Sequence, residues 1–472
     1  MRIGLPGVDP GPPAAPAFSR RTSALLLVGL GLLLALRLPG AWAEGRFQDE
    51  EATIFLAFAW NYPWHEALLR PFGGYLNLPV NVITLGLARM VQHGLLPLEH
   101  APYATMVTGL LAQLTVAAVL LRVRSHAFAG RAAVLAGLLY LAVAPLTEEV
   151  WLNAMHIQFH LALATALLLG VAPATGRPGR IGEAALLILA PLSGPGAIVF
   201  LPLFIARAAI ERDRARWRQA ALLGAGAAIQ LLLFYSGGAG RGAGLDPVSA
   251  VAALGLRTIA LALLGVAQAK TLGSIAGDQY LAGAIPWELA IFAGLVFAAL
   301  LLIALRRRDE ALWLFLAAIA AGLLSVTFGI ATRFAEDAFL VRSGPRYNYL
   351  PIMLFFWGVL ALAARPAFPG RGVVRAGVAA MLIVGLYYFP KPRAAYAAGP
   401  GWRAEVRIWR ADPTHQLAVW PEPWRADLSG SARPCPPPAT PTTPDIPRYC
   451  AAGWSASFES RPQPLAPDGE RE

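Results

Sequence analysis

Apolar segments long enough, or nearly long enough, to cross a lipid bilayer recur along the chain from residue 22 to residue 389. Backbone N–H and C=O groups find no water inside lipid, so such a segment satisfies its hydrogen bonds internally, as a helix does. Hydrophobic residues make up 57% of the chain and charged residues only 14%, which excludes a soluble domain. We therefore predict an all-α polytopic membrane protein with about 10–12 membrane helices.

Arginines gather in short clusters between these apolar segments. Cytoplasmic loops of membrane proteins carry an excess of Lys and Arg, and this bias sets the orientation of the chain. Arg20 and Arg21 therefore predict a cytoplasmic N-terminus, followed by an outer loop. The clusters explain the net charge of +11 without a nucleic-acid partner. We predict a multi-pass protein of a bacterial-type plasma (inner) membrane, whose first partner is the lipid bilayer.

Composition divides the chain into three regions. Residues 1–21 are rich in Pro and Gly, which predicts a disordered cytoplasmic lead. Residues 22–390 form the predicted membrane domain, with a large first outer loop at 41–102. Residues 391–472 form a tail rich in Trp and Pro, which the predicted topology places outside the cell.

Three apolar stretches are not predicted to be simple spans. Residues 181–206 contain the helix-breaking run PLSGPG between two basic loops, which predicts a short hairpin that enters and leaves on the cytoplasmic side. Residues 74–90 would invert every later loop if they crossed alone, and residues 248–267 carry Arg257 near the middle. We predict interfacial helices for both.

The only two cysteines of the chain, Cys435 and Cys450, enclose several prolines in the tail. An outer location permits oxidation, and a bridge across a loop of about 15 residues would stabilise it by roughly 3 kcal/mol in the chain-entropy model. We predict this disulfide, with two unpaired thiols as the alternative. Residues 405–409 and 416–420 of the tail are predicted to be short strands.

The few acidic residues are placed at the ends of apolar segments. Asp49, Glu50 and Glu51 follow the first apolar segment, and Glu148 and Glu149 follow a later one on the same predicted side. One such cluster is also typical of a solvated helix start, because acids favour the first turn. Two clusters on one side favour a shared site with a general base or a bound metal.

Polar residues that can bind a metal follow the second acidic cluster. His156 and His160 come shortly after Asn153 and are one helical turn apart, so they face the same way. Glu148, Glu149 and His156 together predict ligands for a divalent cation, Mg²⁺ or Mn²⁺. The alternative is a polar stripe between helices.

An outer loop rich in arginine precedes the last part of the membrane domain. Arg342 and Arg346 stand just before Tyr347. The planar guanidinium group binds phosphate as a fork, whereas the alternative is an interfacial anchor in which Arg reaches lipid head groups. The two acidic loops on the same predicted side favour phosphate binding.

These features resemble the multi-spanning membrane glycosyltransferases of the GT-C superfamily. The resemblance is carried by the acidic motif with Asp49 and Glu50 after the first helix, the acidic loop with Glu148 and Glu149, and the late outer Arg346. It implies inverting transfer of a sugar from a polyprenyl-phosphate-linked donor at the outer membrane face. The acceptor, a glycan, a lipid or a protein, is not identified by the sequence.

The resemblance also implies roles for individual residues. Asp49 is the first choice for the general base and Glu50 the second, because either would take the proton of the acceptor hydroxyl. Arg346 would hold the donor phosphate and stabilise the leaving group. Three further residues complete the predicted substrate-binding set: Arg342, Tyr347 and Asn153.

Three hypotheses make different geometric predictions. A glycosyltransferase requires Asp49, Glu50, Glu148 and Arg346 to converge on one outward cavity. A transporter or flippase of lipid-linked or small solutes predicts a path beside the hairpin. An intramembrane metalloprotease predicts that the two histidines face both glutamates of the second cluster.

Overall fold

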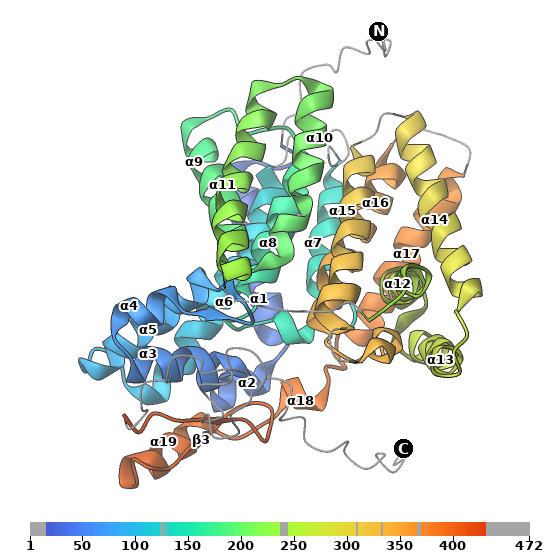
Figure 1. The fold of residues 1–472 in the computed structure, drawn as a ribbon. Helices are drawn as coiled ribbons and strands as arrows, with labels where there is room; N and C mark the ends of the chain where they lie inside the picture. Colours follow the sequence, from blue (N-terminus) through green and yellow to red (C-terminus); the bar gives the residue numbers. More distant parts are fainter. Residues whose placement is uncertain are drawn as a thin grey trace.

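A computed structural model describes residues 16–122, 125, 128, 130–236, 244–307, 310–331, 334–365 and 370–430. Helices dominate these residues, and the named strands form two short antiparallel ribbons (Figure 1). This confirms the predicted all-α class. Seven of the described helices are long and apolar enough to cross a membrane, or up to eight if one bent pair counts as a span. Apolar segments such as α7 (Arg131–Val143) and α8 (Ile157–Leu169) form helices of only 13 residues, which lowers the number below the about 10–12 expected.

The elements follow one another along the chain in this order: α1 (Arg20–Leu36), α2 (Pro39–Glu44), α3 (Ala57–Asn61), α4 (Trp64–Leu69), β1 (Pro71–Phe72), β2 (Tyr75–Leu76), α5 (Leu78–Gln92), α6 (Ala101–Arg122), α7, α8, α9 (Arg177–Leu192), α10 (Leu201–Glu211), α11 (Arg214–Ser236), α12 (Pro247–Leu254), α13 (Leu261–Leu281), α14 (Trp287–Arg306), α15 (Ala311–Leu324), α16 (Arg346–Ala364), α17 (Arg371–Tyr388), α18 (Ala394–Ala397), α19 (Trp402–Ala411), β3 (Leu417–Ala418) and β4 (Arg425–Ala426). The described part also contains π-helical turns at η1 (Glu51–Leu56), η5 (Gly255–Ala260) and η6 (Ser325–Ile330). The predicted disulfide between Cys435 and Cys450 lies outside the described residues.

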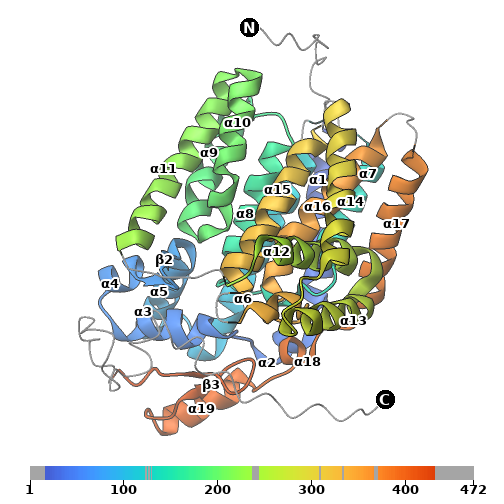
Figure 2. The ribbon, with the colours of Figure 1, turned by 45° about the vertical axis from the view of Figure 1, so that its right-hand side comes forward.

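The long helices stand side by side with arginines gathered at one end. In Figures 1 and 2 the α10–α11 connection, the end of α14 and the start of α15 lie at the same end of the bundle. These segments carry Arg212, Arg214, Arg306 and Arg307. Clusters of this kind are typical of cytoplasmic loops, although the tail at the opposite end also carries arginines.

The first loop and the tail form one layer at the opposite end of the bundle (Figures 1 and 2). Helices α2 to α5 lie there with α18, α19 and β3. A shared apolar cluster holds the two segments together, because Phe47 and Leu56 from the loop belong to it along with Trp402, Val406 and Leu417 from the tail. The layer therefore brings together residues from both ends of the described chain.

One of the two strands predicted in the tail is a helix. Residues 405–409 belong to α19, which buries Trp402 and Val406 one helical turn apart. The spacing of the apolar residues thus follows the helical period rather than the alternation of a strand. The other segment, 416–420, contains β3, which pairs with β4.

The predicted hairpin of residues 181–206 corresponds to α9 and α10. These two helices are bent by 116° at the break between them. The run PLSGPG lies at the bend, where proline removes backbone donors and glycine permits the turn. Pro195 and Gly196 at the tip of this bend line a cavity in the centre of the molecule.

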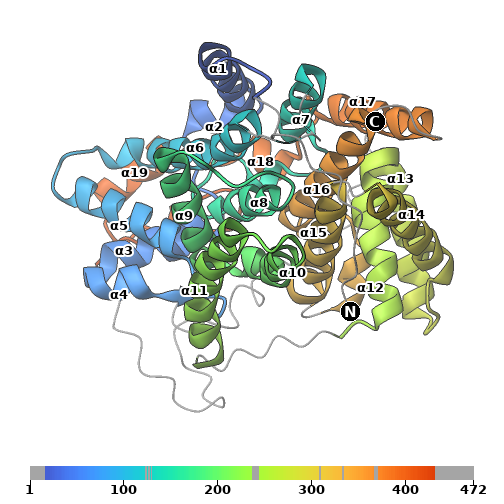
Figure 3. The same ribbon diagram turned by 90° about the horizontal axis from the view of Figure 1, so that it is seen from above.

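The segment from α12 to α13 is long enough to span a membrane but lies across the upright helices. Figure 1 shows both helices nearly end-on, and Figure 3, seen from above, shows them lengthwise. Gly265 breaks the segment with a φ of 85°, a conformation that favours glycine. The orientation agrees with the interfacial helix predicted for residues 248–267.

Helix α16 occupies the centre of the membrane domain. It packs against α15, α17, α7 and α8, and almost all residues after its first turn are buried. Its first residue is Arg346. The arginine singled out in the sequence therefore lies at the end of this enclosed helix that is nearer to the layer of the first loop and the tail.

Arg257 anchors the irregular segment that precedes α16. It is buried in the π-helical turn η5, and its guanidinium N–H groups reach acceptors 2.5–3.1 Å away. The acceptors are the backbone oxygens of Asp337, Ala338, Leu340 and Ser343 and the side-chain oxygen of Asn348. An arginine is thus tolerated inside this apolar segment because all N–H donors of its guanidinium group are hydrogen-bonded.

We expect Arg257→Met to destabilise the protein by about 3–5 kcal/mol, because it leaves several buried oxygens without donors. The stability of Arg257→Lys should fall between that of the wild type and that of Arg257→Met, since an ammonium group has only three N–H donors. Thermal unfolding in detergent measures the effect. Lys270→Met is the matched control, because Lys270 is an exposed cation on α13. Equal stability of Arg257→Met and the control would contradict the anchoring role.

Candidate functional site

Two adjoining cavities lie between the bundle and the layer formed by the first loop and the tail. The first, here called the polar cavity, measures about 310 Å³ and is lined by charged residues from the first loop, the second acidic loop, the segment before α16 and the tail. The second, the aromatic cavity, measures about 120 Å³ and is lined by several phenylalanine and tyrosine rings together with aliphatic and polar residues. Glu50, Gly329, Arg346 and Tyr347 line both. These four residues therefore form the boundary between a charged space and an apolar one.

Asp49 is held in an unusual backbone conformation on the wall of the polar cavity. Its φ is 43°, in the left-handed region that residues other than glycine adopt rarely. Its backbone N–H donates to the carbonyl of Trp420 at 2.6 Å, so the tail holds this strained residue in place. Its carboxylate accepts a hydrogen bond from the Gln48 side chain at 3.2 Å.

Burial raises the pKa of the two first-loop acids that line the polar cavity. For Asp49, burial is the largest cause, and the nearby carboxylates of Glu50 and Glu149 raise its pKa further. Burial also raises the pKa of Glu50, against the opposing effect of the positive charge on Arg346. Carboxyl groups with raised pKa values are stronger bases than solvated ones, as general-base catalysis near neutral pH requires.

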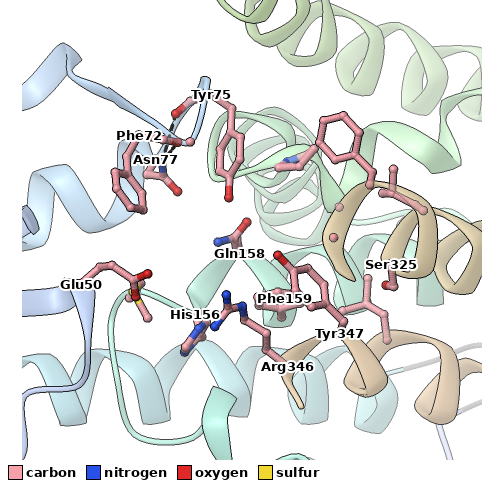
Figure 4. A pocket seen from close by; sticks show the side chains of 18 of the residues that line it. Glu50, Phe72, Tyr75, Asn77, His156, Gln158, Phe159, Ser325, Arg346 and Tyr347 are labelled. Carbon is pink, nitrogen blue, oxygen red and sulfur yellow. Dashed lines mark hydrogen bonds between the residues drawn. The ribbon is translucent and has the colours of Figure 1, made fainter. Parts of the chain in front are cut away.

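Glu149 holds Arg346 in a fixed position. One carboxylate oxygen accepts from the backbone N–H of Arg346 at 2.8 Å, and the other forms an ion pair with its guanidinium group. The guanidinium carbon lies 5.1 Å from the centre of the Tyr347 ring. In Figure 4 Arg346 and the Tyr347 hydroxyl group point toward Gln158 inside the aromatic cavity. The cation is thus preorganised at the boundary between the two cavities.

A junction of buried polar groups joins the two acidic loops. It consists of Gln48, Glu51 and Asn153, and is called here the polar junction. Gln48 donates to the backbone oxygen of Glu149 at 3.0 Å and accepts from Asn153 at 3.1 Å. Glu51 accepts from the backbone N–H of Gln48 at 3.2 Å and from that of Ala154 at 2.5 Å. These bonds fix Asp49 relative to Glu149.

Arg46 extends this arrangement to the tail. It is completely buried and donates to the backbone oxygens of Trp151 and Leu152, the latter at 3.2 Å. It also donates to the backbone oxygen of Tyr396 at 3.2 Å. The first loop, the second loop and the tail are therefore cross-linked beside the polar cavity.

Most of the predicted convergence is present. Asp49, Glu50 and Arg346 line the polar cavity, as do Arg342 and Tyr347. The expected Glu148 is absent from this lining, and its neighbour Glu149 takes the place. Glu148 instead accepts from the backbone N–H of Arg393 at 3.2 Å. Adjacent residues of the short helical turn at 148–150 point in different directions, which the sequence could not resolve.

Asn153, which was predicted to bind substrate, lines neither cavity. Its side chain is fully buried and its amide donates to Gln48 and to the backbone oxygens of Glu149 and Trp151. Its side-chain oxygen accepts from the backbone N–H of His156 at 2.9 Å. All of its hydrogen-bonding groups are used inside the protein, so it shapes the second loop instead.

The residues predicted to bind a metal do not fit a divalent cation. Among the described residues, no group of three or more His, Cys, Asp or Glu side chains is arranged to hold one. Glu148 and Glu149 interact with segments around Arg393 and Arg346, while His156 lines the aromatic cavity. Burial lowers the pKa of His156, followed by the charge of Arg346, which keeps it neutral.

His160 has a structural role. One ring nitrogen is 3.0 Å from the Tyr349 hydroxyl group, and the other is 2.9 Å from the backbone oxygen of Val150. Both ring nitrogens are therefore occupied away from the acids. The histidine geometry required by an intramembrane metalloprotease is not formed by the described residues.

Several residues that line the polar cavity were not expected from the sequence. They come from the tail and from the segment before α16: Asp337, Arg393, Tyr396 and Trp424. Arg393 carried no distinguishing signal in the sequence, because the same predicted outer tail also carries Lys391, Arg403 and Arg407.

Glu51 should make stability depend on pH. Burial raises its pKa from its ordinary value of 4.5 to about 7, so the folded state holds a proton that the unfolded state has released. Its contribution is fully present below about pH 4.5 and is lost as pH rises toward 7, by roughly 3 kcal/mol.

From this linkage we expect the apparent Tm to fall as the pH is raised from about 5 to about 8. The fall should be larger for the wild type than for Glu51→Gln. The glutamine oxygen still accepts a backbone N–H but does not titrate. Glu66→Gln, an exposed acid of the first loop, is the control and should follow the wild type. A pH dependence that is identical in Glu51→Gln and the wild type would contradict the assignment.

The comparison with known proteins does not assign the chain to a family. Neither a family model, nor a curated protein, nor a solved structure matches the chain. The chemistry of the site is therefore inferred from its own residues.

Proposed function

We propose that this chain is a membrane glycosyltransferase that moves a sugar from a polyprenyl-phosphate donor to an acceptor hydroxyl group. The observation that carries the proposal is the boundary formed by Glu50, Arg346 and Tyr347 between the polar and aromatic cavities. A donor of this class has an apolar chain, a phosphate and a sugar joined in series. The apolar chain would approach along the aromatic cavity, the phosphate would meet Arg346, and the sugar would extend toward the acids.

Asp49 is the proposed general base. It lines the polar cavity, and burial and neighbouring carboxylates raise its pKa. In the proposed step the acceptor oxygen attacks the anomeric carbon while Asp49 takes the hydroxyl proton. The bond between that carbon and the phosphate oxygen breaks from the opposite face, which inverts the configuration. Glu50, at the boundary, is the second choice for the base.

Arg346 is the proposed stabiliser of the leaving group. Negative charge builds on the phosphate oxygen as the bond to the sugar breaks, and a fixed guanidinium group stabilises that charge without further reorganisation. The contacts with Glu149 supply the fixation. The residues predicted for a divalent cation do not fit one, so no step is assigned to a metal.

The proposed orientation follows from charge. The arginine-bearing end of the bundle would face the cytoplasm, as would the N-terminus, and the layer of first loop and tail would lie outside. Both cavities adjoin that layer. In a bacterial-type plasma membrane the site would then open to the extracytoplasmic face, where the acceptor is met.

The alternative is a transporter or flippase of lipid-linked or small solutes. One observation favours it, since the broken helix pair reaches the aromatic cavity through Pro195 and Gly196. A further cavity of about 460 Å³ near the start of α9 shares no lining residue with the other two. The strained acid at one side of the site suits group transfer better than passage.

We expect Asp49→Asn and Arg346→Gln each to reduce transfer of radiolabelled sugar by about 100-fold or more, as losses of a general base or a charge stabiliser typically do. The assay uses membranes that contain equal amounts of each variant and a panel of polyprenyl-phosphate sugars. Glu50→Gln should have a smaller effect if Asp49 is the base. Arg407→Gln, on the exposed side of α19, is the control.

Full transfer by both variants would remove the assigned roles. Absence of transfer from every donor by well-folded wild-type protein, together with donor-dependent movement of labelled lipid across vesicles, would instead favour the flippase.

The pH profile of transfer should identify the base. Only the ionised form of Asp49 accepts a proton, so the rate should rise with pH and level off above a midpoint well above the ordinary pKa of 3.8. Raising this pKa moves the loss of activity on acidification toward neutral pH. Initial rates at saturating donor, measured between about pH 4.5 and pH 9, give the midpoint, which is then compared with the ordinary pKa of an aspartate. A midpoint unchanged in Glu149→Gln would contradict the effect of neighbouring carboxylates.

A further inference from the structure

The guanidinium groups of two arginines in the polar cavity have no carboxylate partner in the described part of the chain. Arg342 and Arg393 both line this cavity, yet neither forms an ion pair within the described part of the chain. The guanidinium of Arg393 donates to the backbone oxygen of Arg342 at 3.1 Å, which ties the two residues together. Two positive charges therefore share one wall of a concave site.

The third arginine of the cavity differs from these two. Arg346 is fixed by Glu149 through its backbone and its side chain, and it also lines the aromatic cavity. Arg342 and Arg393 line only the polar cavity. The polar cavity thus presents one guanidinium group that is paired with a carboxylate, at the boundary with the aromatic cavity, and two that are not.

The acids of the same cavity do not neutralise this pair. Glu149 is engaged by Arg346, and Asp337 acts electrostatically on the buried Arg257. Asp49 and Glu50 line the same cavity, but neither forms an ion pair with Arg342 or Arg393. A ligand that brings its own anionic group would therefore relieve the repulsion between Arg342 and Arg393.

We propose that Arg342 and Arg393 form a second anion subsite, which binds a phosphate or carboxylate group carried by the acceptor. The assignment to the acceptor rests on the proposed function, because Asp49 lines only the polar cavity and the attacking hydroxyl group has to approach it there. A volume of about 310 Å³ accommodates a sugar-sized acceptor group. The enzyme thus selects acidic acceptors over neutral ones.

The test measures two ligands on the full chain in detergent. Inorganic phosphate is titrated calorimetrically at constant ionic strength, and polyprenyl phosphate binding is followed by native mass spectrometry. The variants are Arg342→Gln/Arg393→Gln, Arg346→Gln and the control Arg407→Gln. Arg342→Lys/Arg393→Lys keeps the charges, so it separates loss of binding from loss of folding.

We expect the double glutamine variant to bind inorganic phosphate about tenfold or more weakly, as the loss of charge-assisted hydrogen bonds implies. Its binding of polyprenyl phosphate should stay within about twofold, whereas Arg346→Gln should show the reverse pattern. The double lysine variant should retain most phosphate binding, and the control should match the wild type. In the transfer assay phosphate should inhibit the wild type, with no change in the KM for donor, and should not inhibit the double glutamine variant.

Three results would overturn the proposal. Wild-type protein that does not bind phosphate has no such subsite. Equal weakening of both ligands by the double glutamine variant means that the three arginines form a single donor site. Tighter binding of polyprenyl diphosphate than of the monophosphate, lost in the double variant, assigns the subsite to a second phosphate of the donor. If the binding pattern is as expected but no sugar is transferred, the proposed function is wrong. The anion subsite then stands, but its assignment to an acceptor does not.

Discussion

The candidate site depends on buried hydrogen bonds that hold three irregular segments against one another. Asp49 lies in a left-handed conformation that no regular element would support, and it is placed by a bond to the tail and by the polar junction. Arg46 crosses between the second loop and Tyr396 and closes the arrangement. Irregular backbone at the edge of a membrane is stable only where its polar groups find partners inside the protein. A site built from loops therefore requires this network of hydrogen bonds. Loss of one of these bonds would displace the acids.

Arg257 meets the same constraint on the other side of the polar cavity. The segment before α16 has several carbonyl groups without helical partners, and one guanidinium group satisfies them together with Asn348. Burying a charge is costly, but the cost is smaller when the charge serves many acceptors that would otherwise be unpaired. The buried arginines of the two walls therefore support the site, while the arginines exposed to the cavity are left for ligands. The supporting arginines are distinguished from the cavity-facing ones by their burial and by the number of protein oxygens that accept their hydrogen bonds.

The class of the protein could be predicted from sequence because it depends on composition and on runs of one residue type. The hairpin at PLSGPG and the crosswise segment around Arg257 were also predictable, since proline, glycine and an isolated charge act locally. The direction of each side chain in a short turn was not. Glu148 and Glu149 are adjacent and chemically alike, and a turn of three residues decides which of them reaches Arg346. The position of Asn153 inside the second loop was unpredictable for a related reason, because a polar residue that binds substrate and one that bonds to loop backbone look the same in a single sequence.

The contribution of the tail was the least predictable part, and it changes how the site is understood. Residues after α17 showed no catalytic pattern, yet Arg393 and Tyr396 complete the polar cavity and Trp420 holds Asp49. A membrane bundle alone would leave the acids open to solvent, where their pKa values would stay near ordinary values. Covering them with a layer made from both ends of the described chain raises those values and leaves a cavity of defined size. The tail therefore supplies the burial that gives the first-loop acids their basicity, and a site of this kind cannot be located within the membrane helices alone.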